Sequence, residues 1–479
     1  MQSPTIATIW RGTLPRNPTL QSLVVGALIF CACIIGIHSQ VLFSLASIWP
    51  ANAILLAIMV LRPETNRPLT WLTSALAFIG ADLLSGNDLA RSTLLNGANI
   101  AGVAGGALAF QSIPKGTLLM QRPMDATFIV VSIVFSATCA AVAGMVPGIY
   151  LFAMPASDSF YLWFATEMAN YAIFLTLAFS LVMPKAADQP GEVRFRQLSM
   201  AAALIALVGS IALMHLLGRA GSIAFSIPAL IWCAVIFPPT IAMLLTTAAC
   251  GWLLIAAPLN LLPLHTDLAE SASMSSLRLG VAMLAIAAFA VACLTAAWNT
   301  AQARLEHAAS HDALSGLLNR AAFVGRAEQA LKSPGASLLM LDVDHFKQIN
   351  DNHGHAMGDA ALEMMGTTLR KALREGDVVG RIGGEEFAIL LPQTTQMTAS
   401  AVAERLRHAV ATCRLATDGG KPVPMTVSIG LAHVTAQSSL NQLMAAADGA
   451  LYSAKHNGRN RVAIAGTRDL DSRRSARTR

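Results

Sequence analysis

Long apolar runs separated by short polar segments dominate the first 300 residues of the chain. A helix needs roughly 20 apolar residues to cross a lipid bilayer. Ten runs approach that length, over residues 20–38, 41–61, 69–85, 93–110, 126–150, 159–183, 199–217, 222–237, 239–257 and 279–298. Runs that meet at Gln40 and at Pro238 are almost contiguous, so one or two of them could be re-entrant or half-buried. The pattern predicts a multi-pass α-helical membrane domain over 20–298, with about eight to ten transmembrane helices.

The pattern changes after residue 300, where apolar positions follow the spacing of strands and amphipathic helices. The stretch "ASLLMLDVDHF" from Ala336 predicts a buried strand that ends in acidic residues. A helix is predicted over 359–373, with Leu362, Met365 and Leu369 on one face. A hairpin, a helix, a strand, a helix and a short strand follow, over 378–392, 396–414, 423–434, 440–458 and 461–465. This order predicts an α+β fold, with helices covering a mixed sheet.

The segment between Trp298 and His311 joins the two patterns without a Pro or Gly residue. Its residues are good helix formers, so we predict a helix continuous with the last apolar run. Residues 299–310 would then be a signalling helix, and the soluble domain would cover 311–466. If two copies of the chain pair, this helix could form a short coiled coil that carries the signal.

Composition agrees with this division into a membrane part and a soluble part. The chain is 54% apolar and 13% charged, with a mean hydropathy of +0.56, which excludes an ordinary soluble protein. The first 300 residues hold only 12 of the 33 Lys and Arg residues and 10 of the 27 Asp and Glu residues. The seven cysteines show neither a disulfide framework nor a zinc-binding spacing. We expect the lipid bilayer as a partner and no nucleic acid.

Basic residues lie mainly in alternate connections between the apolar runs. This group comprises Arg11, Arg16, Arg62, Arg67, Lys115, Arg122, Lys185, Arg194, Arg196 and Arg304, whereas the other connections hold Arg91, Arg219 and Arg278. Because cytoplasmic loops are enriched in Lys and Arg, the N-terminal segment 1–19 and residues 299–479 are predicted to be cytoplasmic. The basic tail 467–479 is predicted to be disordered, or alternatively to touch acidic lipid.

Several polar residues interrupt the apolar runs, namely Asp82, Asn96, Asn99, Glu167, Asn170 and His215. Ionisable groups inside a membrane are costly and often mark a ligand or ion site. Alternatively, these side chains lie at helix ends or satisfy one another between helices. The sequence leaves both interpretations open.

Acidic residues of the soluble domain are predicted to converge at one end of the sheet. Asp342 ends the first strand, and Glu385 and Glu386 lie at the turn of the hairpin that would neighbour it. Three carboxylates at one place repel each other unless a cation is present. Mg²⁺ prefers a few carboxylate oxygens together with substrate phosphates, and Mn²⁺ is an alternative. The glycines Gly383 and Gly384 would permit a tight turn and let a large ligand lie against the backbone.

Other residues agree with a ligand that carries phosphates. Lys347 follows the acidic strand end, and Lys455 and Arg459 are spaced i, i+4 on one predicted helix face. Asn350 and Asp359 could recognise a base edge, since an Asp accepts hydrogen bonds from guanine but finds no such donor pair on adenine. Taken singly, each residue also fits a solvated helix face or a turn, and only their joint occurrence favours a site.

Five motifs of the soluble half occur together in unbroken order. They are "DALSGLLNR", "DVDHFKQINDNHGHAMGD", "RIGGEEF", "TVSIGLA" and "ADGALYSAKHNGRN". Together they resemble the successive motifs of the GGDEF family of diguanylate cyclases, over about residues 305–466. The resemblance implies a fold like the palm of nucleotide cyclases and polymerases. It also implies that two GTP are condensed into cyclic di-GMP with loss of two pyrophosphates. Each domain would hold one GTP, which implies a homodimer.

The resemblance assigns roles position by position. Asp342, Glu385 and the Val343 carbonyl would bind the metal ion, and Glu385, Glu386 and Lys347 would be catalytic. The substrate-binding residues would be Asn350, His355, Asp359, Lys455, Arg459, Gly383 and Gly384. Ser315 stands where the family usually has Thr. A catalytically inactive receptor for cyclic di-GMP is the alternative, which the intact carboxylates and lysines disfavour.

Two further resemblances concern regulation. "REGD", Arg374 to Asp377, resembles the family's R-x-x-D product-binding inhibitory site, although such a pair alone is more often a helix-end salt bridge. "ASIWPANAILLAIMVLRPE", Ala46 to Glu64, resembles the signature of the first membrane-associated sensor family of bacterial signalling enzymes. The second resemblance implies a sensory role and a location in the bacterial inner membrane. A transporter with a regulatory tail is the alternative.

Overall fold

The computed structural model describes residues 15, 17–42, 45–113, 122, 124–183, 193–218, 220–259, 261–262, 271–331, 335–415, 422–434 and 439–466. The predictions for the tail 467–479 and for most of the segment 1–19 lie outside these residues, as do Arg11, Arg16, Lys115, Lys185 and Arg219. The chain divides into two compact units, Met1–Gln302 and Ala303–Arg479.

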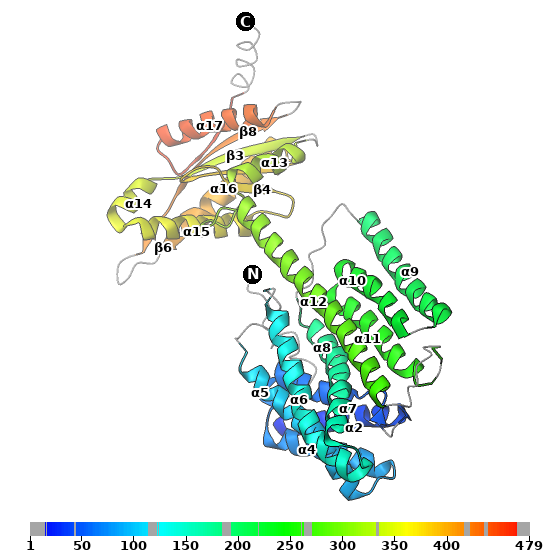
Figure 1. The fold of residues 1–479 in the computed structure, drawn as a ribbon. Helices are drawn as coiled ribbons and strands as arrows, with labels where there is room; N and C mark the ends of the chain where they lie inside the picture. The colour runs from blue at the N-terminus through cyan, green and yellow to red at the C-terminus, as the bar shows by residue number, and fades with distance from the viewer. Residues whose placement is uncertain are drawn as a thin grey trace. The chain divides into compact units, whose positions relative to one another are not determined.

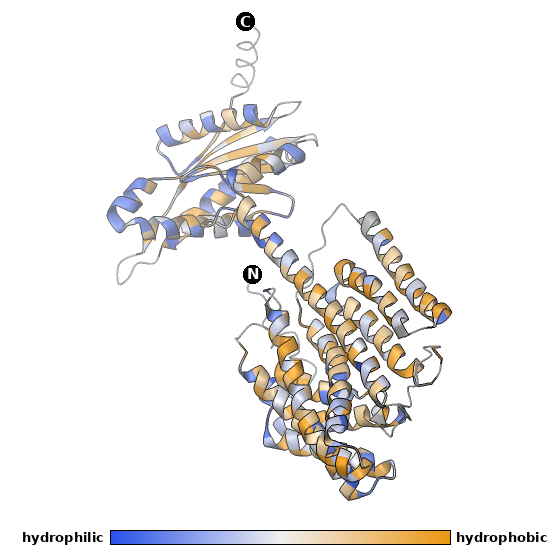
Figure 2. Ribbon diagram, in the orientation of Figure 1, coloured by the Kyte–Doolittle hydropathy of each residue, from blue (hydrophilic) through white to orange (hydrophobic). Residues whose placement is uncertain are grey.

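The N-terminal unit is built from apolar helices, whose hydrophobic colouring is visible in Figure 2. Within the described residues, seven helical stretches are long and apolar enough to cross a membrane. They are α2 (Pro18–His38), α5 (Leu89–Gln111), α6 (Asp125–Phe152), α9 (Val193–Leu217), α11 (Pro239–Ala256), α12 (Ser271–Ser310), and the continuous stretch of α7 (Ala156–Asn170), η3 (Tyr171–Leu175) and α8 (Thr176–Ser180). Shorter elements are α3 (Pro50–Leu61), η1 (Pro63–Thr65), α4 (Pro68–Leu84), η4 (Ala220–Phe225) and α10 (Ser226–Ile236).

Seven of the predicted runs correspond to these full-length stretches, and the runs 41–61, 69–85 and 222–237 correspond to the shorter helices α3, α4 and α10. A single helix over 41–61 is wrong, because β1 (Gln40–Leu42) pairs antiparallel with β2 (Leu45–Ala46) and α3 begins only at Pro50. Proline is well suited to the first helical turn, where its missing N–H leaves no bond unmade. The run 222–237 is likewise divided between η4 and α10. At 12 and 11 residues, α3 and α10 are each too short to span a bilayer alone.

One stretch is much more enclosed than the others. The α7–η3–α8 stretch is 78% buried in the unit, whereas the other long spans are 22–50% buried. Close helix packing around it depends on small residues, which let backbones approach in a membrane domain. At Gly144 of α6, a Cβ atom would come within 2.5 Å of the Trp163 ring of α7. Thr166, Glu167 and Asn170 of α7 are therefore enclosed by neighbouring helices.

Two predictions about the last helix have different outcomes. The α12 helix runs unbroken from Ser271 to Ser310, as the absence of Pro and Gly after Trp298 predicted. Arg278 was predicted to lie in a connection between spans, and this is wrong. It lies inside α12 and is buried. Arg278 therefore does not count among the basic residues of the connections, from which the orientation was predicted.

The C-terminal unit has the predicted α+β fold. Its described residues form a five-stranded mixed sheet in the order β4–β5–β3–β8–β9, in which only β8 and β9 are parallel. The strands are β3 (Ala336–Val343), β4 (Val378–Arg381), β5 (Glu386–Pro392), β8 (Val427–Val434) and β9 (Val462–Ile464). The predicted strand 423–434 is divided between β7 (Val423–Pro424) and β8. β7 pairs with β6 (Arg414–Leu415) in a separate two-stranded sheet.

Helices cover both faces of this sheet, as Figure 1 shows. They are α13 (Arg320–Ala330), α14 (Phe346–His353), α15 (His355–Ala372), α16 (Gln396–Thr412) and α17 (Leu440–His456). Side chains alternate along a strand. Leu339 and Leu341 of β3 therefore join the core under α14, α15 and α16, while Leu338 and Met340 join the core under α13 and α17. The central strand β3 is buried on both faces, and its C-terminal end is the point where functional groups can meet.

Candidate active site

The end of β3 and the β4–β5 turn lie together, as the sequence predicted. Asp342 is the register partner of Glu386 on β5 and of Ser428 on β8, and it is only 5% exposed. The Val343 amide donates to the Glu385 carbonyl at 3.3 Å. Of the two strands of the hairpin, only β5 neighbours β3 directly, whereas β4 forms the edge of the sheet.

The turn that carries Glu385 is fastened at its glycines. The Arg381 guanidinium donates to the Gly384 carbonyl at 2.6 Å and to the Gly383 carbonyl at 3.2 Å. A Cβ atom at Gly383 would lie 2.8 Å from the Glu386 Oε2 atom. Glycine at this position therefore lets the Glu386 carboxylate fold back over the turn.

Asp312 holds Arg381 in this position. Its carboxylate accepts from the Arg381 guanidinium at 3.0 Å and from the Ser315 amide and hydroxyl at 2.8 Å each. Burial opposes ionisation of Asp312, but these three donors outweigh it and keep its pKa below the ordinary value. The Ser315 hydroxyl therefore helps to hold the Asp312 carboxylate by donating a hydrogen bond to it. Sequence reasoning missed this support, because only the fold brings residues 312 and 381 together.

The carboxylates of Asp342 and Glu385 are close enough to repel each other. Burial raises the pKa of Asp342, although hydrogen bonding to Lys455 opposes the shift. Burial also raises the pKa of Glu385, and the negative charges of Asp342 and Glu386 add to that effect. This electrostatic state favours a bound cation.

The donor set fits a magnesium ion. In the ranges that the structure describes, no cluster of three or more His, Cys, Asp or Glu side chains could hold a metal ion by itself. Asp342, Glu385 and the Val343 carbonyl would supply three ligands to such an ion and would leave its remaining positions to water and substrate phosphates. Mg²⁺ binds in this way in nucleotide enzymes, since it keeps several waters and uses one or two carboxylates.

Lys455 reaches the same carboxylate from the end of α17. Its Nζ atom lies 2.7 Å from the Asp342 Oδ2 atom. This approach needs close packing of α17 on β8, and Gly430 permits it, because a Cβ atom there would collide with the Ala447 carbonyl and the Leu451 amide. The ammonium group places a positive charge beside Asp342, where substrate phosphates would need one.

The predicted placement of Lys455 and Arg459 on one helix face is wrong. The α17 helix ends at His456, and Arg459 lies in the turn beyond it. Gly458 has a φ of 106° and Arg459 a φ of 55°, so the chain turns through left-handed conformations that no helix contains. Arg459 still acts electrostatically on Asp342, from a loop rather than from the helix.

Asp344 fastens that loop, a role that the sequence did not reveal. Its buried carboxylate accepts from the Asn460 amide at 3.0 Å, from Ser428 Oγ at 2.7 Å and from Thr426 Oγ1 at 2.8 Å. The Arg407 guanidinium holds the Asn460 side chain at 2.8 Å. Asp344 lies two residues after Asp342 in the sequence, but in the fold its carboxylate positions the loop that carries Arg459.

The residues assigned to guanine lie around the junction of α14 and α15. Asn350 of α14 packs against Gly358 of α15, where a Cβ atom would collide with its Oδ1 atom, so it lies beside the position that precedes Asp359. Lys347 and His355 are exposed, as is Asp359. The structure thus brings Asn350 close to Asp359 and leaves Lys347 and His355 accessible to a ligand.

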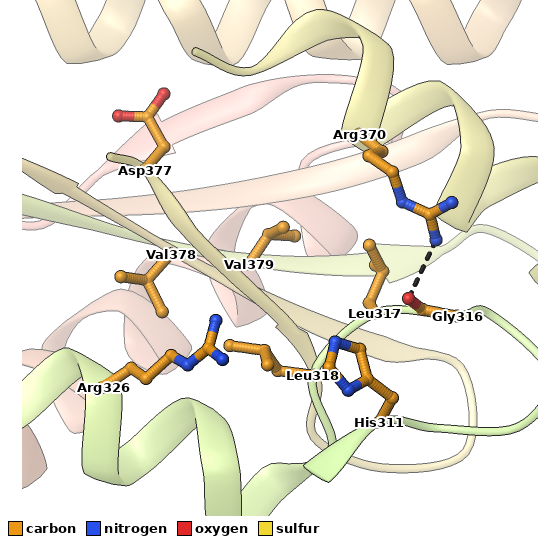
Figure 3. Close-up of a pocket in the computed structure, with 9 residues that line it drawn as sticks. All are labelled: His311, Gly316, Leu317, Leu318, Arg326, Arg370, Asp377, Val378 and Val379. Carbon is orange, nitrogen blue, oxygen red and sulfur yellow. Dashed lines mark hydrogen bonds between the residues drawn. The ribbon is translucent and has the colours of Figure 1, made fainter. Parts of the chain in front are cut away.

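The pair Arg374 and Asp377 forms the salt bridge that the pattern allowed. The Arg374 Nε atom lies 3.2 Å from Asp377 Oδ1, and the Arg374 side chain remains 64% exposed. Beside it lies a cavity of about 180 Å³, which Figure 3 shows. Its lining includes Asp377 and the basic side chains Arg326 and Arg370, which come from α13 and α15.

Comparison with known proteins agrees with this geometry. Residues 309–461 match the family profile described as "Diguanylate cyclase, GGDEF domain". The chain is 29% identical over 475 residues to probable diguanylate cyclase DgcF of Escherichia coli O157:H7, covering 96% of both chains. It is 34% identical over 319 residues to probable diguanylate cyclase DgcF of E. coli K12, covering 64% of this chain and 96% of that relative.

A solved structure similar to the C-terminal unit is the GGDEF domain of DgcB from Caulobacter crescentus in complex with c-di-GMP. It is 32% identical, and the match covers 33% of this chain and 96% of that one, with a TM-score of 0.32. The C-terminal unit is an α+β domain and contains the residues that match the GGDEF family profile. The chain belongs to the GGDEF family of diguanylate cyclases.

Neutralising one site carboxylate should stabilise the metal-free protein. A carboxyl whose pKa rises on folding weakens the folded state above its unfolded-state pKa, because stability falls as pH rises through the window between the two values. We expect Glu385→Gln to raise the thermal midpoint in EDTA at pH 7 by about 1–2 °C. The difference should vanish near pH 4, which is about the unfolded-state pKa of Glu.

The control is Glu363→Gln on the exposed face of α15, which should change neither midpoint. Added Mg²⁺ should stabilise the parent more than Glu385→Gln. A parent that gains no more than this variant would contradict the assignment of Glu385 to the metal.

Loss of Asp344 should weaken substrate binding through the loop that it holds. We expect Asp344→Ala to raise the KM for GTP by about 5–10-fold, as for the loss of a buried hydrogen-bond acceptor, with a smaller effect on kcat. Ser428→Ala removes one partner of the same carboxylate without touching the loop, so its KM should stay within about twofold of the parent. Equal KM values for Asp344→Ala and the parent would show that the loop needs no such support.

Proposed function

We propose that the protein is an active diguanylate cyclase that condenses two GTP into cyclic di-GMP and releases two pyrophosphates. The observation that carries this proposal is the meeting of Asp342 and Glu385 at the end of β3, with Lys455 at 2.7 Å from the first carboxylate. A receptor that had lost catalysis would not need to keep two mutually repelling carboxylates. Membership of the family supports the same conclusion.

The proposed metal ligands are Asp342, Glu385 and the Val343 carbonyl. A bound Mg²⁺ would neutralise charge that develops on the transferred phosphoryl group. Glu385 or Glu386 would accept the proton of the attacking 3′-hydroxyl group, since both lie at the turn beside Asp342. Lys347, Lys455 and Arg459 would hold the triphosphate.

Asn350 and Asp359 would recognise guanine, and His355 would lie close to the nucleoside. Asp359 is exposed beside the α14–α15 junction, so it can accept from the donor pair on the guanine edge. Gly383 and Gly384 would let the nucleotide lie against the turn. Each domain has one such site, so two copies of the chain would face each other as a homodimer, with in-line attack between the two nucleotides.

The N-terminal unit would be a sensor in the bacterial inner membrane. Seven described helices are compatible with membrane spanning. The basic residues Arg62, Arg67, Arg122 and Arg304 would place the N-terminus and the catalytic domain in the cytoplasm. The resemblance of Ala46 to Glu64 to the first membrane-associated sensor family supports a sensory role over transport.

Product inhibition would act through Arg374 and Asp377. The Arg374 side chain is accessible, and the neighbouring cavity carries the two further cations Arg326 and Arg370. A guanidinium can bind a phosphate and stack on guanine, and an Asp can accept from the guanine edge. The DgcB domain, which is similar to this unit, was solved with c-di-GMP bound.

Removing Glu385 should abolish synthesis. We expect full-length protein in detergent with GTP and Mg²⁺ to form cyclic di-GMP, and Glu385→Gln to lower the rate by at least about 100-fold, as for loss of a catalytic acid–base group. Chromatography of the products measures the dinucleotide, and Glu363→Gln is the matched control. A variant as active as the parent would remove Glu385 from the site, and an inactive parent would favour the receptor.

Removing Arg374 should relieve inhibition without loss of synthesis. We expect Arg374→Ala to raise the concentration of added cyclic di-GMP needed for half inhibition by about tenfold or more, as for the loss of a charged hydrogen-bond donor. The initial rate without product should stay close to that of the parent, because Arg374 is outside the β3 site. Unchanged inhibition would refute this assignment.

A further inference from the structure

Five buried polar side chains form a continuous hydrogen-bonded series through the N-terminal unit. Asp82 of α4 accepts from Asn96 of α5 at 2.7 Å, and Asn99 donates to Asn96 at 2.9 Å. Asn52 of α3 donates to Asn99 at 3.0 Å and to both carboxylate oxygens of Glu167 on α7 at 3.0 Å. These residues, which we name the polar series, satisfy one another between four helices. His215, another polar residue of the apolar runs, instead stacks on Trp252.

Burying an ionisable side chain as completely as Glu167 costs free energy. Replacing a buried ionic network by packed apolar residues is often neutral or stabilising. Ionisable groups inside membrane spans therefore tend to be retained for a role in the protein's action. Glu167 lies on the stretch that is most enclosed, and its neighbour along the helix, Asn170, accepts from the Trp49 amide at 2.7 Å.

Arg278 joins the last helix to this region. It lies on α12 and is only 3% exposed. Its guanidinium donates to Thr166 Oγ1 at 2.6 Å and to the Ala46 carbonyl at 3.1 Å, and its charge is attracted to that of Glu167. A single side chain thus holds α12 against α7 and against β2, beside the carboxylate that ends the polar series.

The helix backbone changes just beyond Glu167. Residues Tyr171–Leu175 form a π-helical turn, η3, between α7 and α8. Such wide turns are rare and occur frequently at functional sites. The η3 turn follows directly on Asn170. The α7 segment that contacts Arg278 therefore adjoins a π-helical segment.

We propose that Arg278 is a positioning residue that couples the polar series to α12, and that the Glu167–Arg278 pair regulates the cyclase. This inference rests on the proposed function. Because α12 is continuous from Arg278 to Ser310, about 48 Å of helix at 1.5 Å per residue leads from this pair toward the catalytic domain. Any signal that changes the partners of Glu167 alters the hold on Arg278 and hence the position of α12.

A charge-neutralisation cycle tests the pair. Full-length parent, Glu167→Gln, Arg278→Gln and the double variant are compared in lipid nanodiscs with GTP and Mg²⁺. Each single change leaves one buried charge without its partner, whereas the double change removes both. We expect each single variant to change kcat by about fivefold or more with little change in KM, and the double variant to return within about twofold of the parent. Met283→Leu, at an exposed position of α12, should match the parent.

A second measurement needs no catalysis. Hydrogen–deuterium exchange of the α12 amides should be faster in each single variant than in the parent, and should return toward the parent rate in the double variant. If the parent makes no cyclic di-GMP, the proposed function fails, and the exchange data alone decide the coupling. Single variants that equal the parent in both kcat and exchange overturn the inference. So does a double variant no better than the singles.

Discussion

Repulsion between the carboxylates at the end of β3 is the constraint on which the catalytic unit depends. The sheet places Asp342 opposite Glu386 and brings the backbone of Val343 to that of Glu385. Burial then raises the pKa of both Asp342 and Glu385, so the fold holds the site in an electrostatically unfavourable state. Cations relieve this state, and the ammonium of Lys455 already does so in part.

The surrounding residues keep this unfavourable arrangement in place. Asp312 fixes Arg381, and Arg381 fixes the carbonyls of the turn that presents Glu385. On the other side, Asp344 fixes the loop after α17 through Asn460. Both aspartates hold backbone segments in place through hydrogen bonds, Asp312 by way of Arg381 and Asp344 by way of the Asn460 amide. A strained cluster persists when the structure around it is over-determined.

The two units differ in which side chains they bury and which they expose. The catalytic unit buries apolar side chains on both faces of its sheet and gathers acidic groups at the C-terminal end of β3. The N-terminal unit exposes apolar side chains and buries polar ones, such as Asn52 and Glu167. Buried polar groups need hydrogen-bond partners, and these groups find them in one another. The most informative polar residues of that unit are therefore buried ones, and among them Arg278 links α12 to α7.

The sequence alone determined much of this protein, because the signals are local. Alternation along β3, the amphipathic faces of its helices and the long apolar runs each depend on nearby residues. The meeting of Asp342 with Glu385 was predictable, since both sit at the ends of strands that adjoin. Helix α3 begins only at Pro50, and the left-handed turn at Gly458 follows the end of α17. The apolar pattern showed neither boundary, which is why the run 41–61 and the placement of Arg459 were wrong.

Only the tertiary structure decided which polar groups support others. Asp312 and Arg381, or Asp344 and Asn460, are far apart along the chain, and no spacing relates them. The same holds for Arg278, which charge counting placed in a connection and the fold placed beside Thr166. A hydrogen bond between distant residues depends on how helices and strands pack, and that is a property of the whole fold and not of any one segment.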